Sequence, residues 1–481
     1  MSRPRASKQG SDVMQAIDKV IEGGFCIGCG GCAALAPTDF AVEQTPLGML
    51  QARALTAPEA RARDLSPLCP MSGEGADEDA LGAERFPDLP RDDRIGRHGF
   101  VGLGWVEAGD WRARGSSGGL LSWLAAELLA RGEVDAVVQV SPGGAWGLFS
   151  YAVSRSPDDL RRSAKSRYHP VQAADAIAHM RDAPGRFLFI GLPCFVKSVR
   201  LIMKSDPAFA AKIPFLFGLV CGHLKSSRFA ELPAWQKGLA PGDLASIDFR
   251  DKIEGRRASD YGFRATARDG SEVHARMGEV LGRDWGQGMM KYEACNWCDD
   301  VVAEAADIAV GDAWLPGWSD DWRGANVVVA RNAALIALLR DGMARGALTF
   351  EEVAPDLAAR SQAAGLRDRR EGLAHRLATR AAAGAWAPRK RVAPAMAPEA
   401  RRGRMYDMRQ RITRLSHEAF QEAREAGDLS VFMARMEPVL AAYGRVQLPP
   451  GRESVRGRFK RVLLATMPQG LKQRLKAMLG K

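Results

Sequence analysis

Short apolar runs alternate with helix-like patterns through the middle of the chain. Between about residues 98 and 330 the strand-like runs are VGLGWVEAG, VDAVVQV, RFLFIGLP, PFLFGLVC, ADIAVGDAW and ANVVVAR, and the clearest amphipathic stretch is GLLSWLAAELLARG. Alternation of strand and helix patterns is typical of an α/β fold, in which helices pack on the faces of a sheet. The central part of the chain is therefore expected to be an α/β core.

The pattern changes on either side of this core and predicts four segments. Residues 20–95 are rich in Gly, Pro and acidic residues and hold the first four cysteines, which indicates a small N-terminal module. The core spans residues 96–332, a helical extension rich in Ala and Arg spans 333–451, and a basic tail spans 452–481. The linker APRKRVAPAMAPEA divides the extension, and no internal repeat is present.

Composition narrows the class of protein. With 481 residues and 46% hydrophobic content, the chain can fold as several domains without disulfides. Its polar N-terminus and the lack of a long apolar run predict a cytoplasmic protein. The net charge of +11 could suggest nucleic-acid binding, but no nucleic-acid recognition motif accompanies it, so specific nucleic-acid binding is not expected.

The first cysteines have the spacing of an iron-sulfur motif. Cys26, Cys29 and Cys32 form C-x-x-C-x-x-C with glycines between them, which lets three thiolates converge under a tightly folded backbone. Ala36 stands where a bacterial ferredoxin would have its next cysteine, so the fourth ligand must come from elsewhere, and Cys69, followed by proline, is the obvious donor. Zinc or a coincidental turn is the alternative, although zinc more often uses two separated C-x-x-C pairs.

The other four cysteines form a weaker pattern. Cys295 and Cys298 make one C-x-x-C pair, and Cys194 and Cys221 each follow an apolar strand-like run. Ligands in open α/β sheets collect beyond the carboxyl ends of strands, where these last two thiols are expected. Each lone cysteine could equally be a small buried apolar residue, and the pair could be a redox dithiol.

A glycine- and serine-rich loop precedes the amphipathic helix that begins near residue 120. Ser116, Ser117, Gly118 and Gly119 leave the backbone amides free to face an anion, and the helix N-terminus adds its positive dipole end. A diphosphate could bind there, although a turn or a flexible connector would have the same composition. No G-x-G-x-x-G fingerprint is present, so a dinucleotide would be held by a fold other than the Rossmann type.

Two further segments carry polar groups suited to the same site. The run KSRYHP contains Ser166 and Tyr168, which could contact phosphate and an aromatic ring, but a solvated basic loop is the commoner explanation. Asp312, at the end of the run ADIAVGD, could face the same cavity or simply cap a turn.

These motifs together resemble the coenzyme F420 hydrogenase/dehydrogenase beta-subunit family. The matching segments are CIGCGGC, LCP, RGSSGGLLSWLAAELLARGEVDAVV, KSRYHP, IGLPCFVKSVR, GLVCGH and CNWCDDVVAEAADIAVGD, in family order over about residues 24 to 330. The resemblance implies bound FAD, one or two 4Fe-4S clusters, and hydride chemistry at the flavin coupled to one-electron transfer. Members act on coenzyme F420, on chlorophyll or chlorophyllide derivatives, or near surface-polysaccharide synthesis, so the family alone names no substrate.

The resemblance gives the expected architecture and function. It implies a ferredoxin-like N-terminal iron-sulfur module, a flavin-binding core, and an oxidoreductase that links an organic substrate or deazaflavin carrier to a ferredoxin-like electron carrier or a partner redox subunit. The expected ligands are Cys26, Cys29, Cys32 and Cys69 for the first 4Fe-4S cluster and Cys194, Cys221, Cys295 and Cys298 for the second. A non-catalytic electron-relay or assembly subunit and a zinc-bearing scaffold are the rival interpretations.

The basic tail predicts a separate contact. Residues 452–481 carry nine basic side chains against one acidic one, interspersed with leucine, valine and methionine, and Pro468 and Gly470 divide the segment into pieces too short to span a bilayer. Such a segment could lie peripherally on an anionic membrane. Packing on the protein's own surface or on an acidic redox partner is the alternative.

Overall fold

A computed structural model describes residues 14–145 and 147–447. The predicted membrane contact of the basic tail lies outside these residues. The described helices include none that is both long enough and apolar enough to cross a membrane.

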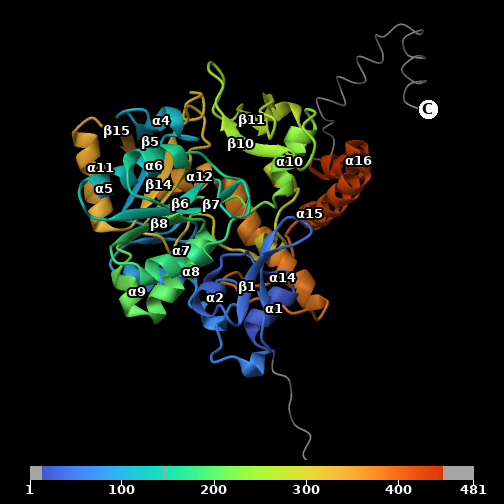
Figure 1. The fold of residues 1–481 in the computed structure, drawn as a ribbon, viewed down its shortest axis with the longest axis horizontal. Coiled ribbons are helices and arrows are strands. Elements are labelled where there is room, and N and C mark those ends of the chain that lie inside the picture. Colours follow the sequence, from blue (N-terminus) through green and yellow to red (C-terminus); the bar gives the residue numbers. More distant parts are fainter. Residues whose placement is uncertain (1–13, 146, 448–481) are drawn as a thin grey trace, which may run out of the picture.

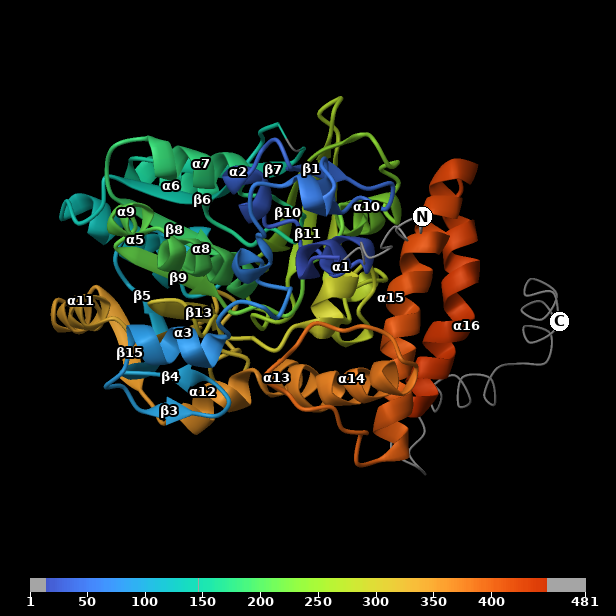
Figure 2. The same cartoon turned by 90° about the horizontal axis from the view of Figure 1, so that it is seen from below.

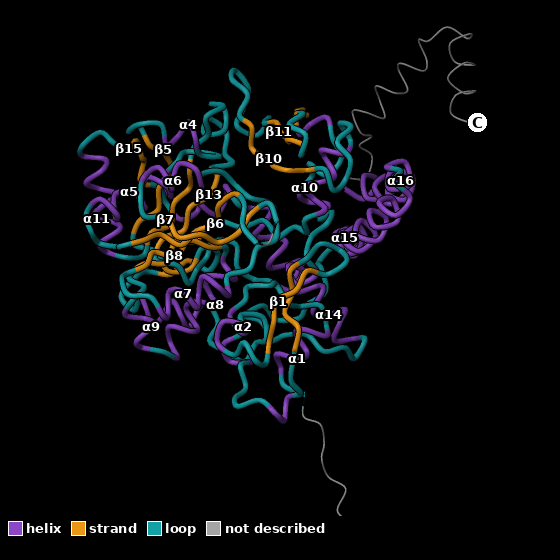
Figure 3. Tube along the Cα trace, viewed as in Figure 1, coloured by secondary structure: helices purple, strands orange, loops and turns teal. Residues whose placement is uncertain are grey.

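The centre of the molecule is an eight-stranded mixed sheet with the order β15-β5-β14-β13-β9-β8-β6-β7. Strands β13, β9, β8 and β6 run parallel to one another, and antiparallel strands complete both sides. Figure 3 shows these strands gathered in one layer. Their bounds are β5 Phe100–Val106, β6 Ala136–Pro142, β7 Phe149–Ser154, β8 Phe187–Gly191, β9 Phe215–Leu219, β13 Ile308–Asp312, β14 Asn326–Ala330 and β15 Leu348–Glu352.

Helices cover both faces of this sheet, which confirms the expected α/β class (Figure 1). One face packs against α4 (Trp111–Arg114), α5 (Leu120–Ala130), α6 (Pro157–Ser163) and α11 (Ala333–Ala344). The other face packs against α7 (Ala174–Asp182), α8 (Pro193–Ser205) and α9 (Pro207–Ala211). Because both faces are buried, strands such as β8 are apolar throughout, with Leu188 on the first face and Phe187 and Phe189 on the second.

Smaller elements surround the second face. The N-terminal part contains α1 (Ala16–Glu22), α2 (Gly31–Leu35), the hairpin β1 (Phe40–Gln44) and β2 (Leu50–Ala54), α3 (Glu78–Arg85), and the short pair β3 (Arg91–Asp92) and β4 (Gly96–Arg97). A separate three-stranded antiparallel sheet, beside α10 (Arg228–Trp235), is formed by β10 (Leu244–Asp251), β11 (Gly262–Ala267) and β12 (Glu272–Arg276).

The C-terminal part divides between the sheet and a set of helices. Helix α11 and strand β15, at the start of the segment expected to be a helical extension, complete the central sheet layer. Beyond them lie α12 (Pro355–Ser361), α13 (Ala363–Arg367), α14 (Leu373–Ala382), α15 (Ala400–Ala426) and α16 (Leu429–Gln447). Helices α15 and α16 pack side by side as a hairpin (Figure 2). Their buried side chains, including Phe420 and Tyr443, share one apolar core with the N-terminal part.

Candidate functional site

A cavity of about 260 Å³ lies where the four parallel strands end. Its lining includes residues at the carboxyl ends of β6, β8, β9 and β13, the region where open α/β sheets bind ligands. Most of the predicted flavin-binding residues also line it, together with Asp312. These residues are Ser116, Ser117, Gly119, Ser166 and Tyr168.

Gly118 does not line the cavity. A Cβ atom on Gly118 would lie 2.6 Å from Asn326 Oδ1 on β14, so this glycine faces the sheet rather than the cavity. Gly119 has a φ of +86° and packs against the backbone of α4, where a Cβ atom would lie 2.7 Å from the Arg112 nitrogen. The two glycines therefore allow the loop to pack tightly between β14 and α4.

Side chains fix the loop that leads into α5. Ser117 Oγ donates to the Ala325 carbonyl at 2.7 Å, and the Leu120 amide donates to Asn326 Oδ1 at 3.1 Å. The next two residues of the helix, Leu121 and Ser122, line the cavity. Amides in the first turn of a helix have no partner within the helix, so this end of α5 can accept an anion.

The loop and the KSRYHP segment meet in space as the sequence predicted. The Ser166 amide donates to Ser116 Oγ at 2.6 Å. Arg250, at the end of β10, links the same groups: it donates to the Ser116 carbonyl at 3.3 Å and to Tyr168 Oη at 3.3 Å, and it forms an ion pair with Asp312 at 3.1 Å. Sequence reasoning missed Arg250, whose one signal was a basic side chain within the strand-like run IDFRD.

Buried titratable groups adjoin the cavity. Burial lowers the pKa of His169 to about 4, so this cavity-lining imidazole stays neutral at pH 7; its Nδ1 lies 2.9 Å from the Pro170 carbonyl. Burial, with the charges of Lys165 and Arg250, lowers the pKa of Lys252 to about 7. Lys252 Nζ donates to the carbonyls of Arg112 in α4, of Ser117 at 3.2 Å and of Arg323.

The first four cysteines line one small cavity of about 30 Å³. Burial raises the pKa of Cys26 to about 11 and that of Cys69 to about 12, and the neighbouring thiols contribute to both shifts. Backbone amides point at the sulfurs: the amides of Gly28 and Ala52 donate to Cys26 Sγ at 3.4 and 3.2 Å. Gly28 has a φ of +69°, and a Cβ atom there would lie 2.1 Å from the Leu50 carbonyl oxygen. These features suit thiolates held by a cluster.

The other four cysteines also come together. Burial raises the pKa of Cys194 well above its ordinary value, and the nearby thiols of Cys221, Cys295 and Cys298 add to that rise. The Leu224 amide donates to Cys295 Sγ at 3.3 Å. Cys194 lies in the first turn of α8, which follows β8, and Cys221 follows β9, so two adjacent parallel strands bring both thiols to one place.

Arg369, from the C-terminal segment, packs beside this second set of cysteines. Arg369 is buried between α13 and α14, donates to the Gly222 carbonyl, and donates to the Asp300 carbonyl at 3.4 Å. Its charge counteracts the rise that burial causes in the pKa of Cys221 and Cys295. Arg369 lies beyond the segments matched at the sequence level, so no sequence motif pointed to it.

Helix α8 connects the two cysteine sets and the cavity. Cys194 lies in its first turn, and Ser198, one turn later, accepts a hydrogen bond from Cys29 Sγ at 3.5 Å. Tyr151 lines the cavity and stacks on Phe195, also on α8. Both Cys29 and Cys194 contribute to the raised pKa of Tyr151, whose main cause is burial. The cavity and both cysteine sets are therefore immediate neighbours.

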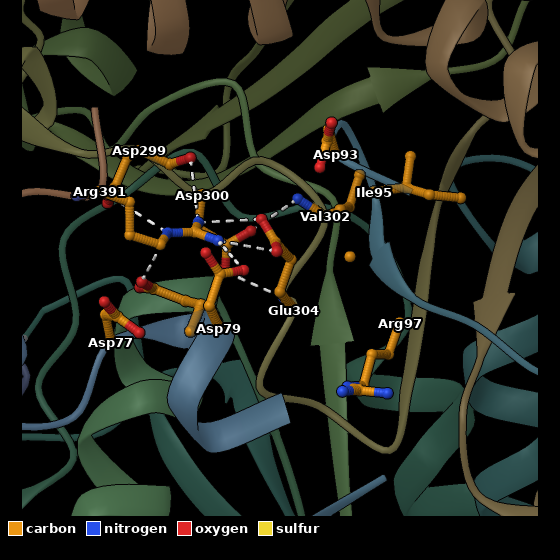
Figure 4. A network of polar contacts seen from close by, with 12 residues as sticks. Asp77, Asp79, Asp93, Ile95, Arg97, Asp299, Asp300, Val302, Glu304 and Arg391 are labelled. Atoms are coloured by element: carbon orange, nitrogen blue, oxygen red, sulfur yellow. Dashed lines mark hydrogen bonds and ion pairs between the residues drawn. The ribbon is translucent and has the colours of Figure 1, made fainter. Parts of the chain in front are cut away.

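Arg391, in the linker between α14 and α15, lies among four carboxylates, of which Figure 4 labels Asp79, Asp299 and Glu304. Asp299 directly follows Cys298 of the second set. Arg391 pairs with Glu78 at 3.4 Å and Asp79 at 3.1 Å, both on α3, and with Asp299 at 3.4 Å and Glu304 at 2.9 Å. The carboxylates raise the pKa of Arg391, although burial opposes the shift. One side chain thus connects the N-terminal part, the CNWCDD segment and the C-terminal helices.

The donor sets fit two 4Fe-4S clusters by number and chemistry. Each contains four cysteine thiols, the ligand that such clusters use. Across the described residues, no group of three or more His, Cys, Asp or Glu side chains is arranged to hold a single metal ion. Each iron of a four-iron cluster takes its own thiolate, so the four sulfurs need not converge on one point.

Comparisons with known proteins agree with the sequence motifs. The family model described as coenzyme F420 hydrogenase/dehydrogenase, beta subunit N-term, matches residues 102–178, and the corresponding C-terminus model matches residues 185–356. No curated protein matches the sequence at a significant level. Among solved structures, a chain from the xenon-derivatized F420-reducing NiFe hydrogenase complex of Methanosarcina barkeri is similar, with 17% identity and a TM-score of 0.45. The match covers 60% of this chain and 96% of that one.

Proposed function

Because the chain belongs to the coenzyme F420 hydrogenase/dehydrogenase beta-subunit family, a family of redox subunits, we propose that it is an FAD- and iron-sulfur-dependent oxidoreductase. The observation that carries this proposal is the adjacency of one ligand cavity and two four-cysteine sets around α8. When bound, FAD supplies hydride exchange with an organic molecule and one-electron exchange with iron-sulfur clusters.

The cavity loop would hold the flavin. The first-turn amides of α5 after Leu120, with Ser116 and Ser117, suit the diphosphate, and Gly118 and Gly119 keep that loop against β14 and α4. Ser166 and Tyr168 line the cavity beside this loop: Ser166 donates to Ser116, and Arg250 links Tyr168 to the loop through hydrogen bonds. His169 offers a neutral imidazole that can donate or accept a hydrogen bond at neutral pH.

The cysteines would hold two 4Fe-4S clusters. Cys26, Cys29, Cys32 and Cys69 would ligate the first, in an N-terminal module of ferredoxin-like type, and Cys194, Cys221, Cys295 and Cys298 the second. Amides directed at the sulfurs and the Arg369 guanidinium would stabilise the negative charge of thiolates and so raise the cluster potentials. One cysteine of each set, Cys26 and Cys295, is buried and the others are partly buried, so the protein limits the access of water to both sites.

The expected substrate and electron carrier follow from this redox chemistry. An organic substrate or a deazaflavin carrier would enter the cavity, and a ferredoxin-like carrier or partner redox subunit would exchange electrons with the clusters. The protein's contribution is to fix distances, exclude water and tune potentials.

A reductive titration of the anaerobically purified full chain tests the proposal. A protein with one FAD and two 4Fe-4S clusters takes up about four electrons, two at the flavin and one at each cluster. Uptake of about two electrons with no flavin absorbance would instead identify an electron relay. A colourless protein that contains zinc would contradict both functions.

A further inference from the structure

A second cavity, of about 480 Å³, adjoins the first. The two cavities share Ala164, Lys165 and Arg167 in their linings, so these residues form the boundary between them. The second cavity lies between residues 142–143 and 147–149 at the adjoining ends of β6 and β7, the end of α6 and strand β10. It is therefore positioned to hold another part of a molecule that reaches the first cavity.

The lining of the second cavity is strongly basic. Its charged members are Arg114, Arg161, Arg162, Lys165 and Arg167, against the single carboxylate of Asp248. A concave surface lined by one sign of charge concentrates ligands of the opposite sign. Guanidinium groups also match the planar, two-oxygen geometry of phosphate and carboxylate groups.

Arg167 is the side chain with the most capacity left for a ligand. Its Nη2 donates to the Ala164 carbonyl at 2.7 Å and its guanidinium lies 5.0 Å from the centre of the Phe149 ring. Its Nε is buried without a hydrogen-bond partner, and no carboxylate of the described residues forms an ion pair with it. Because the guanidinium lines both cavities and its charge has no carboxylate partner among the described residues, a ligand oxygen that contacts it from either cavity would be stabilised by a charge-assisted hydrogen bond.

The other three arginines are held by ion pairs with aspartates near the surface, whereas Lys165 pairs with Asp248 at 2.8 Å. Arg114 and Arg161 both pair with Asp110, and the Arg114 side chain is 56% exposed. Exposed ion pairs of this kind contribute little to stability, so an arriving anion can compete with the aspartate. Lys165 has a φ of +92°, a conformation that is strained for a residue with a side chain and that is frequent at ligand sites.

We propose that the second cavity binds a phosphate or carboxylate group of the organic redox partner, and that the partner's reducible ring enters the first cavity. This inference deepens the proposed function and rests on it for the identity of the first cavity's occupant. It assigns the substrate to the class of anionic organic molecules, with Arg167 as the central contact. The flavin diphosphate is assigned elsewhere, to the start of α5.

Binding of inorganic pyrophosphate to the full, flavin-loaded chain tests this assignment by isothermal titration calorimetry. The variant Arg167→Gln is expected to bind pyrophosphate at least about tenfold more weakly, because a charge-assisted contact is lost. Arg167→Lys should restore part of the affinity. The double variant Arg161→Gln/Arg162→Gln, which changes residues that line only the second cavity, should also weaken binding. Arg345→Gln removes an exposed, paired arginine on the C-terminal side of α11 and should leave binding unchanged.

The flavin content of every variant separates the possible failures. Unchanged pyrophosphate affinity in Arg167→Gln, with flavin retained, overturns the inference and leaves the proposed function intact. Loss of flavin in Arg167→Gln would assign the second cavity to the cofactor itself and likewise overturns the inference. If even the wild-type chain takes up no flavin, the proposed function fails, while the effect of each substitution on pyrophosphate binding still reports on the basic cavity.

Discussion

Replacing Arg250 by methionine should loosen the candidate flavin cavity more than any other single change near it. The Arg250 side chain is 3% exposed, and its guanidinium joins the Ser116 carbonyl, Tyr168 Oη and the Asp312 carboxylate. Methionine keeps much of the side-chain length and removes all three polar links. The perturbation therefore acts on two adjacent segments of the cavity lining at once.

The size of the effect follows from the Asp312 carboxylate, which the substitution leaves without its ion-pair partner. Removing one partner of a buried ion pair costs roughly 3–5 kcal/mol. Asp312 is 23% exposed, so water can partly solvate its free carboxylate and the cost should fall to about 2–3 kcal/mol. If half or more of this free energy is needed to hold Ser116 and Tyr168 in their binding positions, the flavin Kd should rise about tenfold to a hundredfold.

Two measurements check these values. Flavin fluorescence on the flavin-depleted chain gives the Kd, and urea unfolding gives the stability change. A double-mutant cycle with Asp312→Asn should give a coupling of about 1–3 kcal/mol for two residues in direct contact. Arg264→Met is the matched control, because Arg264 lies on the neighbouring strand β11, is 49% exposed, and pairs only with surface carboxylates. Equal flavin affinity in the Arg250 and Arg264 variants would refute the role given to Arg250.

Three further outcomes are expected. Cys194→Ala and Cys221→Ala should each lower the iron content from about eight to about four per chain, since either loss removes a ligand of the second cluster; unchanged iron would exclude that cluster. Gly118→Val should release flavin while iron is retained, because the new side chain collides with β14 and displaces the loop. The control Gly444→Val, at a position in α16 that faces open space, should keep its flavin. Full flavin retention in both variants would place the diphosphate elsewhere. Burial holds the pKa of His169 at about 4 in the folded chain, below its unfolded value of about 6.5. Between these values only the unfolded state binds the proton, so the free energy of unfolding should fall as the pH is lowered from roughly 6.5 to 4, by at most about 3 kcal/mol. Urea unfolding of His169→Gln should show a flatter pH dependence in that window, and an unchanged slope would mean that the imidazole is not buried as a neutral group.

The α/β core and the position of the ligand cavity could be predicted from the sequence because both depend on local patterns. Apolar runs with no polar face predict strands covered on both sides, as found for β8 and β9. Parallel strands place their carboxyl ends at one edge, so a cysteine after each of two neighbouring strands predicts that Cys194 and Cys221 meet. The loop and the KSRYHP segment were likewise expected to adjoin, and the Ser116–Ser166 hydrogen bond joins them.

The side chains that connect these parts could not be predicted. Arg250, Arg369 and Arg391 come from three different segments, and each acts through neighbours more than 50 residues away in the chain. A basic residue in a strand or helix usually faces solvent, so its burial becomes visible only when the tertiary structure supplies the carboxylate or carbonyl groups around it. Gly118 illustrates the same limit, because a glycine in a phosphate-type loop can face either the ligand or the supporting sheet.

The central claim is that one chain carries a flavin and two four-iron clusters, and the contents of the anaerobically purified protein test it most directly. Iron, acid-labile sulfide and flavin should be measured on the same sample as its ultraviolet-visible spectrum. The account predicts about eight iron, about eight sulfide and about one FAD per chain, the amounts in two 4Fe-4S clusters and a single flavin site. Zinc in place of iron, or iron and sulfide without any flavin, would contradict it.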